Sequence, residues 1–198
     1  MRYAGLEWLW RLITQPKRIK RIWQATFGLV MMLVRYKVFN SLGYRKNVVS
    51  VILDSTNQIL IGKRSPKDKY LKDVGEYEKV KFQNYWQLPQ GGVDGQEDII
   101  TAAQRETFEE LGIKNINYLK ISSRKNFYSW NAPLRPLWFN KYHFVGQEQS
   151  IVYFKFQGSD SDIKIDNNEF ENFQWVTVND LVEKVHRERL VLAKIVQE

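Results

Sequence analysis

Three glutamates set close together are the residues of this sequence best suited to chemistry: Glu106, Glu109 and Glu110. On a helix of 3.6 residues per turn, Glu106 and Glu110 lie one above the other and Glu109 flanks them, so three carboxylates converge on one side. This cluster opposes helix stability, because the C-terminal end of a helix already carries about half a negative charge. A divalent cation held by hard oxygen ligands would compensate, which suits Mg²⁺ or Mn²⁺.

The flanking residues predict the helix that positions these carboxylates. A glycine-rich turn leads to a polar helix start at Glu97 and Asp98, and Gly112 suits the left-handed residue that closes a helix. Arg105 lies one turn before Glu109 and is expected to hold that carboxylate in position. For three glutamates taken alone, a solvated acidic face is the competing interpretation.

More than three residues match a known pattern, however. The stretch fits G-x5-E-x7-R-E-U-x-E-E-x-G-U, where U is apolar, at all seven fixed positions: Gly91, Glu97, Arg105, Glu106, Glu109, Glu110 and Gly112. Each residue type has a background of roughly one in fifteen, so a chance match is very improbable. The stretch resembles the Nudix box. Thr107 departs from it at an apolar position, and we expect this threonine to face the sheet with its hydroxyl bonded back to the helix backbone.

The resemblance implies roles for individual residues. Glu106, Glu109 and Glu110 would bind the metal and Arg105 would orient them. Gly91 would supply a backbone oxygen to the metal, and Glu97 would tie the loop to the helix.

A further carboxylate outside the box usually completes the site in this family. The matching residue is Glu169 in NNEFENFQWV, and Glu148 in GQEQ is the rival. The general base stays open between Glu110 and the outside residue.

Three flanking motifs narrow the resemblance: GYRKNVV, WQLPQGG and GQEQSIVYF are similar to the RNA pyrophosphohydrolase and dinucleoside polyphosphate hydrolase branch. The resemblance favours phosphate and nucleotide contacts from Arg45, Lys63, Arg64 and Gln90, and arginine suits a terminal phosphate best. It implies removal of pyrophosphate from the 5′ end of RNA, or of phosphate from a diphosphorylated end. The close alternative is an asymmetric dinucleoside polyphosphate (Ap4A) hydrolase. A non-catalytic nucleotide-binding module and a lipid-linked diphosphate hydrolase are the rivals of other classes.

The order of elements predicts an α+β fold, and the resemblance specifies the Nudix fold, a mixed sheet sandwiched between helices. Valine- and isoleucine-rich or alternating segments predict strands at 47–54, 59–63, 116–122, 150–156 and 173–176, the first two forming a hairpin. Helices are expected at 180–185 and 188–196. Residues 66–81 and 131–140 read as loops, and the first is long enough to be an insertion or lid.

Charge divides the chain into a basic, Trp-rich helical arm, residues 1–42, and a catalytic domain, residues 43–198. Residues 1–48 hold ten Lys or Arg and a single acidic residue, Glu7, whereas the remaining residues have a net charge of −1. A negatively charged partner is the natural explanation of this asymmetry. There is no cysteine, which excludes disulfides and fits a reducing cytoplasm.

The arm contains two candidate helices, one around residues 6–13 and one from about Ile19 to Phe39. The uncharged stretch between Arg21 and Arg35 has 13 residues, which is too short to span a bilayer comfortably. No small-x-small cleavage site follows it, so we expect no signal peptide. The arm could pack on the catalytic domain, form a homodimer, lie on a membrane as a peripheral contact, or bind RNA.

Overall fold

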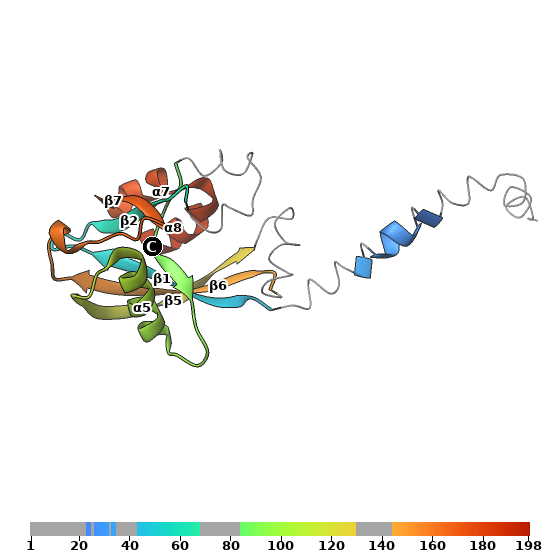
Figure 1. Ribbon diagram of the computed structural model, residues 1–198, viewed down its shortest axis with the longest axis horizontal. Coiled ribbons are helices and arrows are strands. Elements are labelled where there is room, and N and C mark those ends of the chain that lie inside the picture. The colour runs from blue at the N-terminus through green and yellow to red at the C-terminus, as the bar shows by residue number, and fades with distance from the viewer. Residues whose placement is uncertain (1–22, 25, 32, 35–42, 68–83, 130–143) are drawn as a thin grey trace, which may run out of the picture.

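The computed structural model describes residues 23, 24, 26–31, 33, 34, 43–67, 84–129 and 144–198. The described residues from 43 to 198 form a mixed seven-stranded sheet between two helical layers (Figure 1). The strands are β1 (Arg45–Leu53), β2 (Ile59–Arg64), β3 (Trp86–Gln87), β4 (Gln90–Gly92), β5 (Ile116–Ser129), β6 (Gly146–Phe156) and β7 (Phe170–Val176). The helices are α5 (Ile99–Leu111), α7 (Val178–Lys184) and α8 (Leu190–Gln197), with short 3-10 turns η2 (Asp160–Asp162) and η3 (Arg187–Arg189).

Strand β1 organises the sheet. The path runs β3-β2-β1-β6-β5, with β4 paired to the first half of β1 and β7 paired to β2. β1 is parallel to β6 along its whole length, and its other pairings are antiparallel. The expected hairpin is confirmed, and Asn57 takes the left-handed conformation in its turn, with φ of 64°. This arrangement places β4 directly before the box helix and beside the start of β1.

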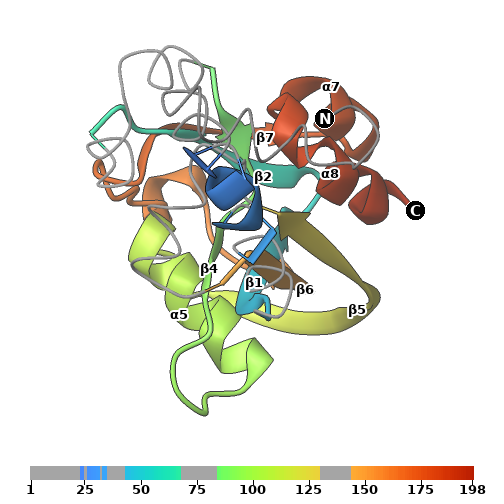
Figure 2. The ribbon, with the colours of Figure 1, turned by 90° about the vertical axis from the view of Figure 1, so that its right-hand side faces the viewer.

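Side chains alternate between the two faces of the sheet. From β1, Val49 and Val51 face α7 and α8, whereas Val48 faces α5. Figure 2 shows α5 and the α7–α8 pair on opposite sides of the strands. The predicted sandwich of a mixed sheet between helices is therefore confirmed.

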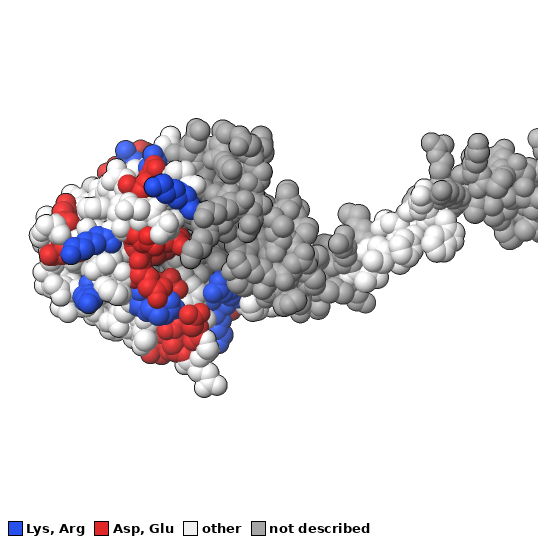
Figure 3. Space-filling model, in the orientation of Figure 1, with Lys and Arg blue, Asp and Glu red and all other residues white. Residues whose placement is uncertain are grey.

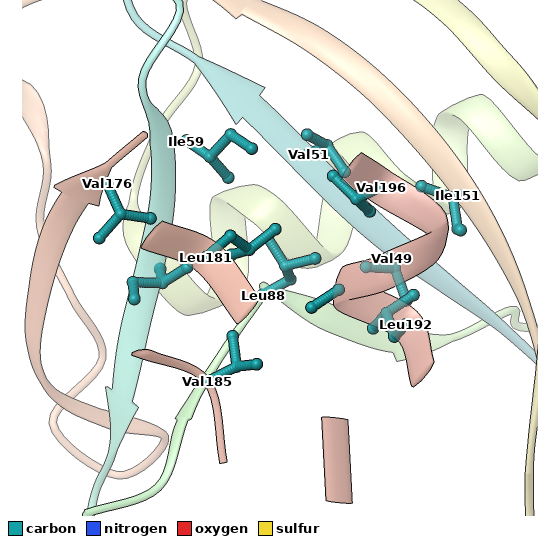
Figure 4. Packing of buried hydrophobic residues seen from close by; sticks show 12 residues of the cluster. Val49, Val51, Ile59, Leu88, Ile151, Val176, Leu181, Val185, Leu192 and Val196 are labelled. Atoms are coloured by element: carbon teal, nitrogen blue, oxygen red, sulfur yellow. The ribbon is translucent and has the colours of Figure 1, made fainter. Parts of the chain in front are cut away.

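The largest apolar cluster lies on the α7–α8 side (Figure 4). Its twelve buried members come from the sheet and both helices: Val49, Val51, Ile59, Ile61, Leu88, Ile151, Val176, Leu181, Val185, Leu192, Ala193 and Val196. Burying such side chains is the main source of folding free energy. This face therefore anchors the sheet.

Several strands are longer than predicted. β5 runs for 14 residues to Ser129, twice the predicted length, because its register shifts near Ser122–Arg124 and then continues. β6 begins at Gly146, four residues before the predicted start, and so contains GQEQ. The short strands β3 and β4 were not predicted. Most of loop 66–81 and all of loop 131–140 lie outside the described residues.

Of the N-terminal arm, residues 23, 24, 26–31, 33 and 34 are described, and all are helical. They fall within the predicted second helix. The predicted first helix lies outside the described residues. No described helix is long and apolar enough to cross a membrane.

Candidate active site

The box helix α5 begins and ends with the expected residues. Asp98 is its N-cap, and its carboxylate accepts hydrogen bonds from the backbone N–H groups of Ile100 and Thr101. Gly112 closes it with φ of 66°, a left-handed conformation that costs glycine little. Its own N–H donates to the carbonyl of Phe108. Both ends of the helix are thus fixed by local sequence.

Arg105 connects the glycine-rich turn to the helix. Its Nη2 donates to Glu97 Oε1 at 2.6 Å and to the Gly92 carbonyl at 2.8 Å. Its Nη1 donates to Glu106 Oε1 at 2.8 Å and to Glu109 Oε2 at 3.2 Å. The expected contact with Glu109 is present, and one guanidinium orients three carboxylates. Glu97 in turn accepts a hydrogen bond from the Asp94 N–H, and the Arg105 hydrogen bond lowers the pKa of Glu97.

The two adjacent glycines before the helix give room to charged side chains. A methyl group on Gly91 would overlap the carboxylate of Glu106. One on Gly92 would overlap the guanidinium of Arg45. Any residue larger than glycine would therefore push a charged group away from the turn. Arg45 and Glu106 thereby lie against adjacent glycines of the same turn.

Glu110 is the most deeply buried of the three box glutamates. It is 6% exposed, and its Oε2 accepts a hydrogen bond from the Gln90 N–H at 3.1 Å. Burial raises the pKa of Glu110 well above its usual value, and the nearby charges of Glu106 and Glu169 raise it further. Burial also raises the pKa of Glu106. The site therefore holds two carboxyl groups, Glu106 and Glu110, whose ionised forms are disfavoured by burial.

Glu109 differs from its neighbours because its side chain is 55% exposed. In the described parts of the chain, no three Asp, Glu or His side chains are grouped closely enough to hold a metal ion. Hydrogen bonds to Arg105 occupy Glu106 and Glu109, and Glu110 bonds to the backbone. A cation would have to draw these side chains together. The three box carboxylates still suit a divalent cation, since carboxylate oxygens are the ligands that Mg²⁺ and Mn²⁺ prefer.

The two candidates for the outside carboxylate lie in different environments. Glu169 precedes β7 and is close enough to Glu110 for its charge to raise the pKa of that carboxyl. Glu148 lies on β6, and its carboxylate is 2.6 Å from Lys125 Nζ. The fold therefore brings Glu169 to the box, and it pairs Glu148 with a lysine of the neighbouring strand.

A buried network of side-chain amides orients Gln90. Gln149 is fully buried; its Nε2 donates to Gln90 Oε1 at 2.9 Å and to Asn47 Oδ1 at 3.3 Å. Asn126 donates to Gln149 Oε1 at 2.6 Å. Gln149 was missed in the sequence, although strand alternation puts it on the same face as buried Ile151. A glutamine on an inward-facing position is the signal that could have found it.

The remaining predicted contacts, Lys63 and Arg64, are adjacent on β2 but differ in environment. Lys63 Nζ pairs with Glu171 across the strands at 2.6 Å. Arg64 lies over the ring of Tyr85, 6.0 Å from its centroid, and its charge acts to lower the pKa of Glu110. Arg64 is thus placed at the box, whereas Lys63 takes part in a surface ion pair.

A second unpredicted cluster joins η3 to the sheet. Tyr85 stacks on His186 with ring centroids 4.1 Å apart, and Glu188 accepts hydrogen bonds from the hydroxyls of Tyr85 and Tyr128. Arg189 is 5% exposed and lies over the Tyr128 ring. These residues come from three distant parts of the chain, so no local pattern marks them.

Thr107 faces the sheet as predicted, but its hydrogen bond differs from the prediction. It is fully buried, and its hydroxyl donates to Ser50 Oγ at 2.8 Å, not to the helix backbone. The Ser50 hydroxyl then donates to the Ala103 carbonyl at 3.2 Å. The helix backbone is reached through β1, because a serine of that strand lies opposite the threonine.

Acidic side chains gather over α5 and are bordered by basic ones (Figure 3). A family model described as the NUDIX domain matches residues 43–198. The chain belongs to the Nudix family. It is a Nudix hydrolase, and members of this family act on pyrophosphate bonds and generally use divalent metal ions.

Two relatives of this chain are named RNA pyrophosphohydrolase. The chain is 34% identical over 163 residues to an RNA pyrophosphohydrolase of Pelagibacter ubique, covering 80% of this chain and 92% of that protein. It is 31% identical over 159 residues to an RNA pyrophosphohydrolase of Wolbachia pipientis, covering 78% and 88%.

Solved structures share the fold at lower identity. An Ap4A hydrolase of C. elegans in a binary complex has a TM-score of 0.53 at 19% identity, covering 77% of this chain and 94% of that one. The E. coli dihydroneopterin triphosphate pyrophosphohydrolase has a TM-score of 0.53 at 14% identity, covering 79% and 99%. These two confirm the Nudix fold.

Proposed function

We propose that this Nudix hydrolase removes pyrophosphate from the 5′ end of triphosphorylated RNA. The observation that carries the proposal is its 34% identity, over nearly the whole length of the relative, to an RNA pyrophosphohydrolase. An intact box supports it, since all seven fixed residues are present and Arg105 hydrogen-bonds to three of them, Glu97, Glu106 and Glu109. A diphosphorylated 5′ end, losing phosphate, is a substrate of the same chemistry. The proposal places the enzyme in the cytoplasm.

We assign the divalent cation, Mg²⁺ or Mn²⁺, to Glu106, Glu109, Glu110 and Glu169 with the backbone oxygen of Gly91. The bound cation would neutralise phosphate charge and lower the pKa of a water molecule. Burial and mutual repulsion raise the pKa of Glu106 and Glu110, and a cation would relieve both effects. Arg105 would keep the ligands oriented, as its hydrogen bonds to Glu106 and Glu109 indicate.

In the proposed reaction, the oxygen of a water molecule bonds to a phosphorus atom of the 5′ triphosphate. The phosphoanhydride P–O bond breaks, pyrophosphate leaves, and RNA with a 5′ monophosphate remains. A carboxylate takes the proton of the water. Glu110 and Glu169 are the two candidates for this general base. The charge of Glu169 and burial both raise the pKa of Glu110, so each favours a proton on that carboxyl group.

Arg45, Arg64 and Gln90 are the substrate contacts that we propose, together with Lys63 at the margin. Arg45 lies against Gly92 beside the ligand set, and Arg64 adds a positive charge near Glu110. Cations at these places would attract a polyphosphate and favour its charge in the transition state. Lys63 would first have to leave Glu171.

The test offers 5′-triphosphorylated RNA and diadenosine tetraphosphate at equal concentration with Mg²⁺. Faster release of pyrophosphate or phosphate from the RNA supports the proposal. Preferential formation of ATP and AMP would overturn it in favour of an Ap4A hydrolase. Glu110→Gln should abolish either product, which excludes a contaminating activity.

The choice of Glu169 over Glu148 is tested with matched variants. Glu169→Gln should lower kcat by roughly 10²-fold, because it removes a carboxylate from the site. Glu148→Gln breaks only a partly exposed pair with Lys125, so kcat should stay within about threefold. A larger loss in Glu148→Gln would reverse the assignment.

For the arm, residues 1–42, we propose a role separate from the chemistry of residues 43–198. The arm could contact a membrane surface or pair with a second copy of the chain. The described helical residues favour contact with a membrane surface.

A further inference from the structure

The helical residues between 23 and 34 expose a large apolar surface. Seven side chains are between 44% and 67% exposed: Trp23, Phe27, Leu29, Val30, Met31, Leu33 and Val34. Contiguous apolar surface of this kind marks an interaction site. We propose that this segment inserts into the surface of a bilayer containing anionic lipids.

The distribution of these side chains around the helix favours lipid over a protein groove. At 100° per residue, Phe27 and Val34 lie within about 20° of each other, whereas Leu29 lies about 160° from Phe27. Apolar residues thus cover well over half of the circumference, and no charged residue lies between Arg21 and Arg35. A one-sided groove would leave part of this surface in water. A lipid phase can surround it.

The length of the segment limits how deeply it enters. The ten described helical residues lie between positions 23 and 34, a span over which an α-helix rises about 17 Å, whereas the hydrocarbon core of a bilayer is about 30 Å thick. The segment therefore enters one leaflet, with Trp23 at the boundary between lipid and water, stacked on Phe27 at 5.6 Å.

The charges at the two ends decide between lipid and a second copy of the chain. Lys17, Arg18, Lys20 and Arg21 precede the segment, and Arg35 and Lys37 follow it. Because both ends are basic, parallel and antiparallel pairing of two copies would each bring like charges together. Anionic headgroups can neutralise the basic residues at both ends at once.

Flotation of the full-length chain tests the proposal without any substrate, so its result is independent of the proposed reaction. We expect binding to vesicles of phosphatidylcholine with phosphatidylglycerol, at least about tenfold stronger than to phosphatidylcholine alone. Leu29→Asp with Leu33→Asp should abolish binding. Leu119→Asp, at a similarly exposed leucine of β5, is the matched control and should bind like the wild type.

A second set of variants separates charge from apolar contact. Changing Lys17, Arg18, Lys20 and Arg21 to Gln should reduce binding to the level seen with phosphatidylcholine alone. Hydrolysis of a short soluble substrate should be unchanged in every variant, which shows that each one folds.

Equal flotation of the Leu29→Asp, Leu33→Asp double variant and the wild type would overturn the proposal. So would absence of flotation, whether the chain then sediments as a dimer or as a monomer. A dimer dispersed by the double variant would assign the segment to a second copy.

Discussion

The two faces of the sheet use the same strand in opposite ways. Toward α7 and α8, β1 contributes Val49 and Val51 to the largest apolar cluster. Toward α5, the same strand contributes Val48 and a hydroxyl, Ser50, beneath a helix that carries Glu106 and Glu110. One face is packed for stability, and the other accepts buried charge.

Buried carboxylates explain why the two faces must differ. An ionised carboxyl loses solvation when it is buried, and the pKa of Glu106 and Glu110 rises for that reason. Such a face lowers the free energy of unfolding unless a cation is bound. The apolar face has to offset this cost, which is the usual relation between an active site and its scaffold.

The sharpest test of this difference is Glu110→Gln. Turnover should fall by roughly 10³-fold or more, because a buried negative group of the site is lost. Without metal, however, the variant should be at least as stable as the wild type at pH 8. Thermal melting with and without Mg²⁺, beside a pyrophosphate-release assay, measures both effects.

The pH dependence of that stability follows from the raised pKa. Because the folded pKa of Glu110 lies above the unfolded value, its favourable contribution is complete below the unfolded pKa. It is lost as pH rises through the folded pKa. The melting temperatures of Glu110→Gln and wild type should therefore converge toward pH 4 and diverge toward pH 8. Mg²⁺ should raise the melting temperature of the wild type more than that of the variant. A wild type that is more stable than Glu110→Gln at pH 8 without metal would contradict a destabilising Glu110.

On the apolar face, Leu181→Ala should do the reverse. Leu181 is fully buried in the cluster, so removing its side chain should cost about 3 kcal/mol of unfolding free energy. Turnover per folded molecule should stay within about twofold. Urea unfolding and active-site titration measure the two quantities. Val178→Ala on the same helix, 37% exposed, is the matched control and should cost no more than about 0.5 kcal/mol. A large loss of turnover in Leu181→Ala would mean that the two faces are coupled.

What the sequence predicts well is what local residues determine. The ends of α5, the turn at Asn57 and the contact of Arg105 with Glu109 depend on residues within a few positions of one another. The alternation of apolar residues likewise predicted the strands of the core. Glu169 was reached through the resemblance, since its distance from Glu110 along the chain gives no physical signal.

What the sequence predicts poorly depends on contacts between distant strands. The strand was predicted to end at Ser122, whereas β5 continues to Ser129 after a shift in its register against β6. Gln149 was missed for a related reason, since its partners Gln90, Asn47 and Asn126 come from three other strands. The Thr107 hydroxyl donates its hydrogen bond to Ser50, which lies 57 positions away in the sequence, and not to the backbone of its own helix.

The amide network crosses the boundary between scaffold and site, and Gln149→Leu tests it. Loss of the carboxamide removes the hydrogen bonds that it makes to the side chains of Gln90, Asn47 and Asn126, at a cost of about 1–3 kcal/mol in stability. If Gln90 contacts the substrate, KM should also rise, by roughly tenfold, with a smaller change in kcat. Gln147→Leu is the matched control, because Gln147 meets Gln149 only at 3.4 Å. An unchanged KM in Gln149→Leu would restrict the network to stability.

The smallest effect on stability is expected at the two hydrogen-bonded hydroxyls of Thr107 and Ser50, between α5 and β1. Thr107→Val keeps the shape of the side chain but removes its hydrogen bond to Ser50, which should cost about 1 kcal/mol. Ser50→Ala removes two hydrogen bonds, the one that Ser50 accepts from Thr107 and the one that it donates to the Ala103 carbonyl. A double-mutant cycle in urea should give a coupling energy of about 0.5–1 kcal/mol, because the two side chains touch. Turnover should stay within about threefold, since neither hydroxyl is proposed to contact substrate or metal. If Thr107→Val instead lowers turnover tenfold or more, the hydroxyl pair fixes the position of neighbouring Glu106, and the threonine is a positioning residue of the site.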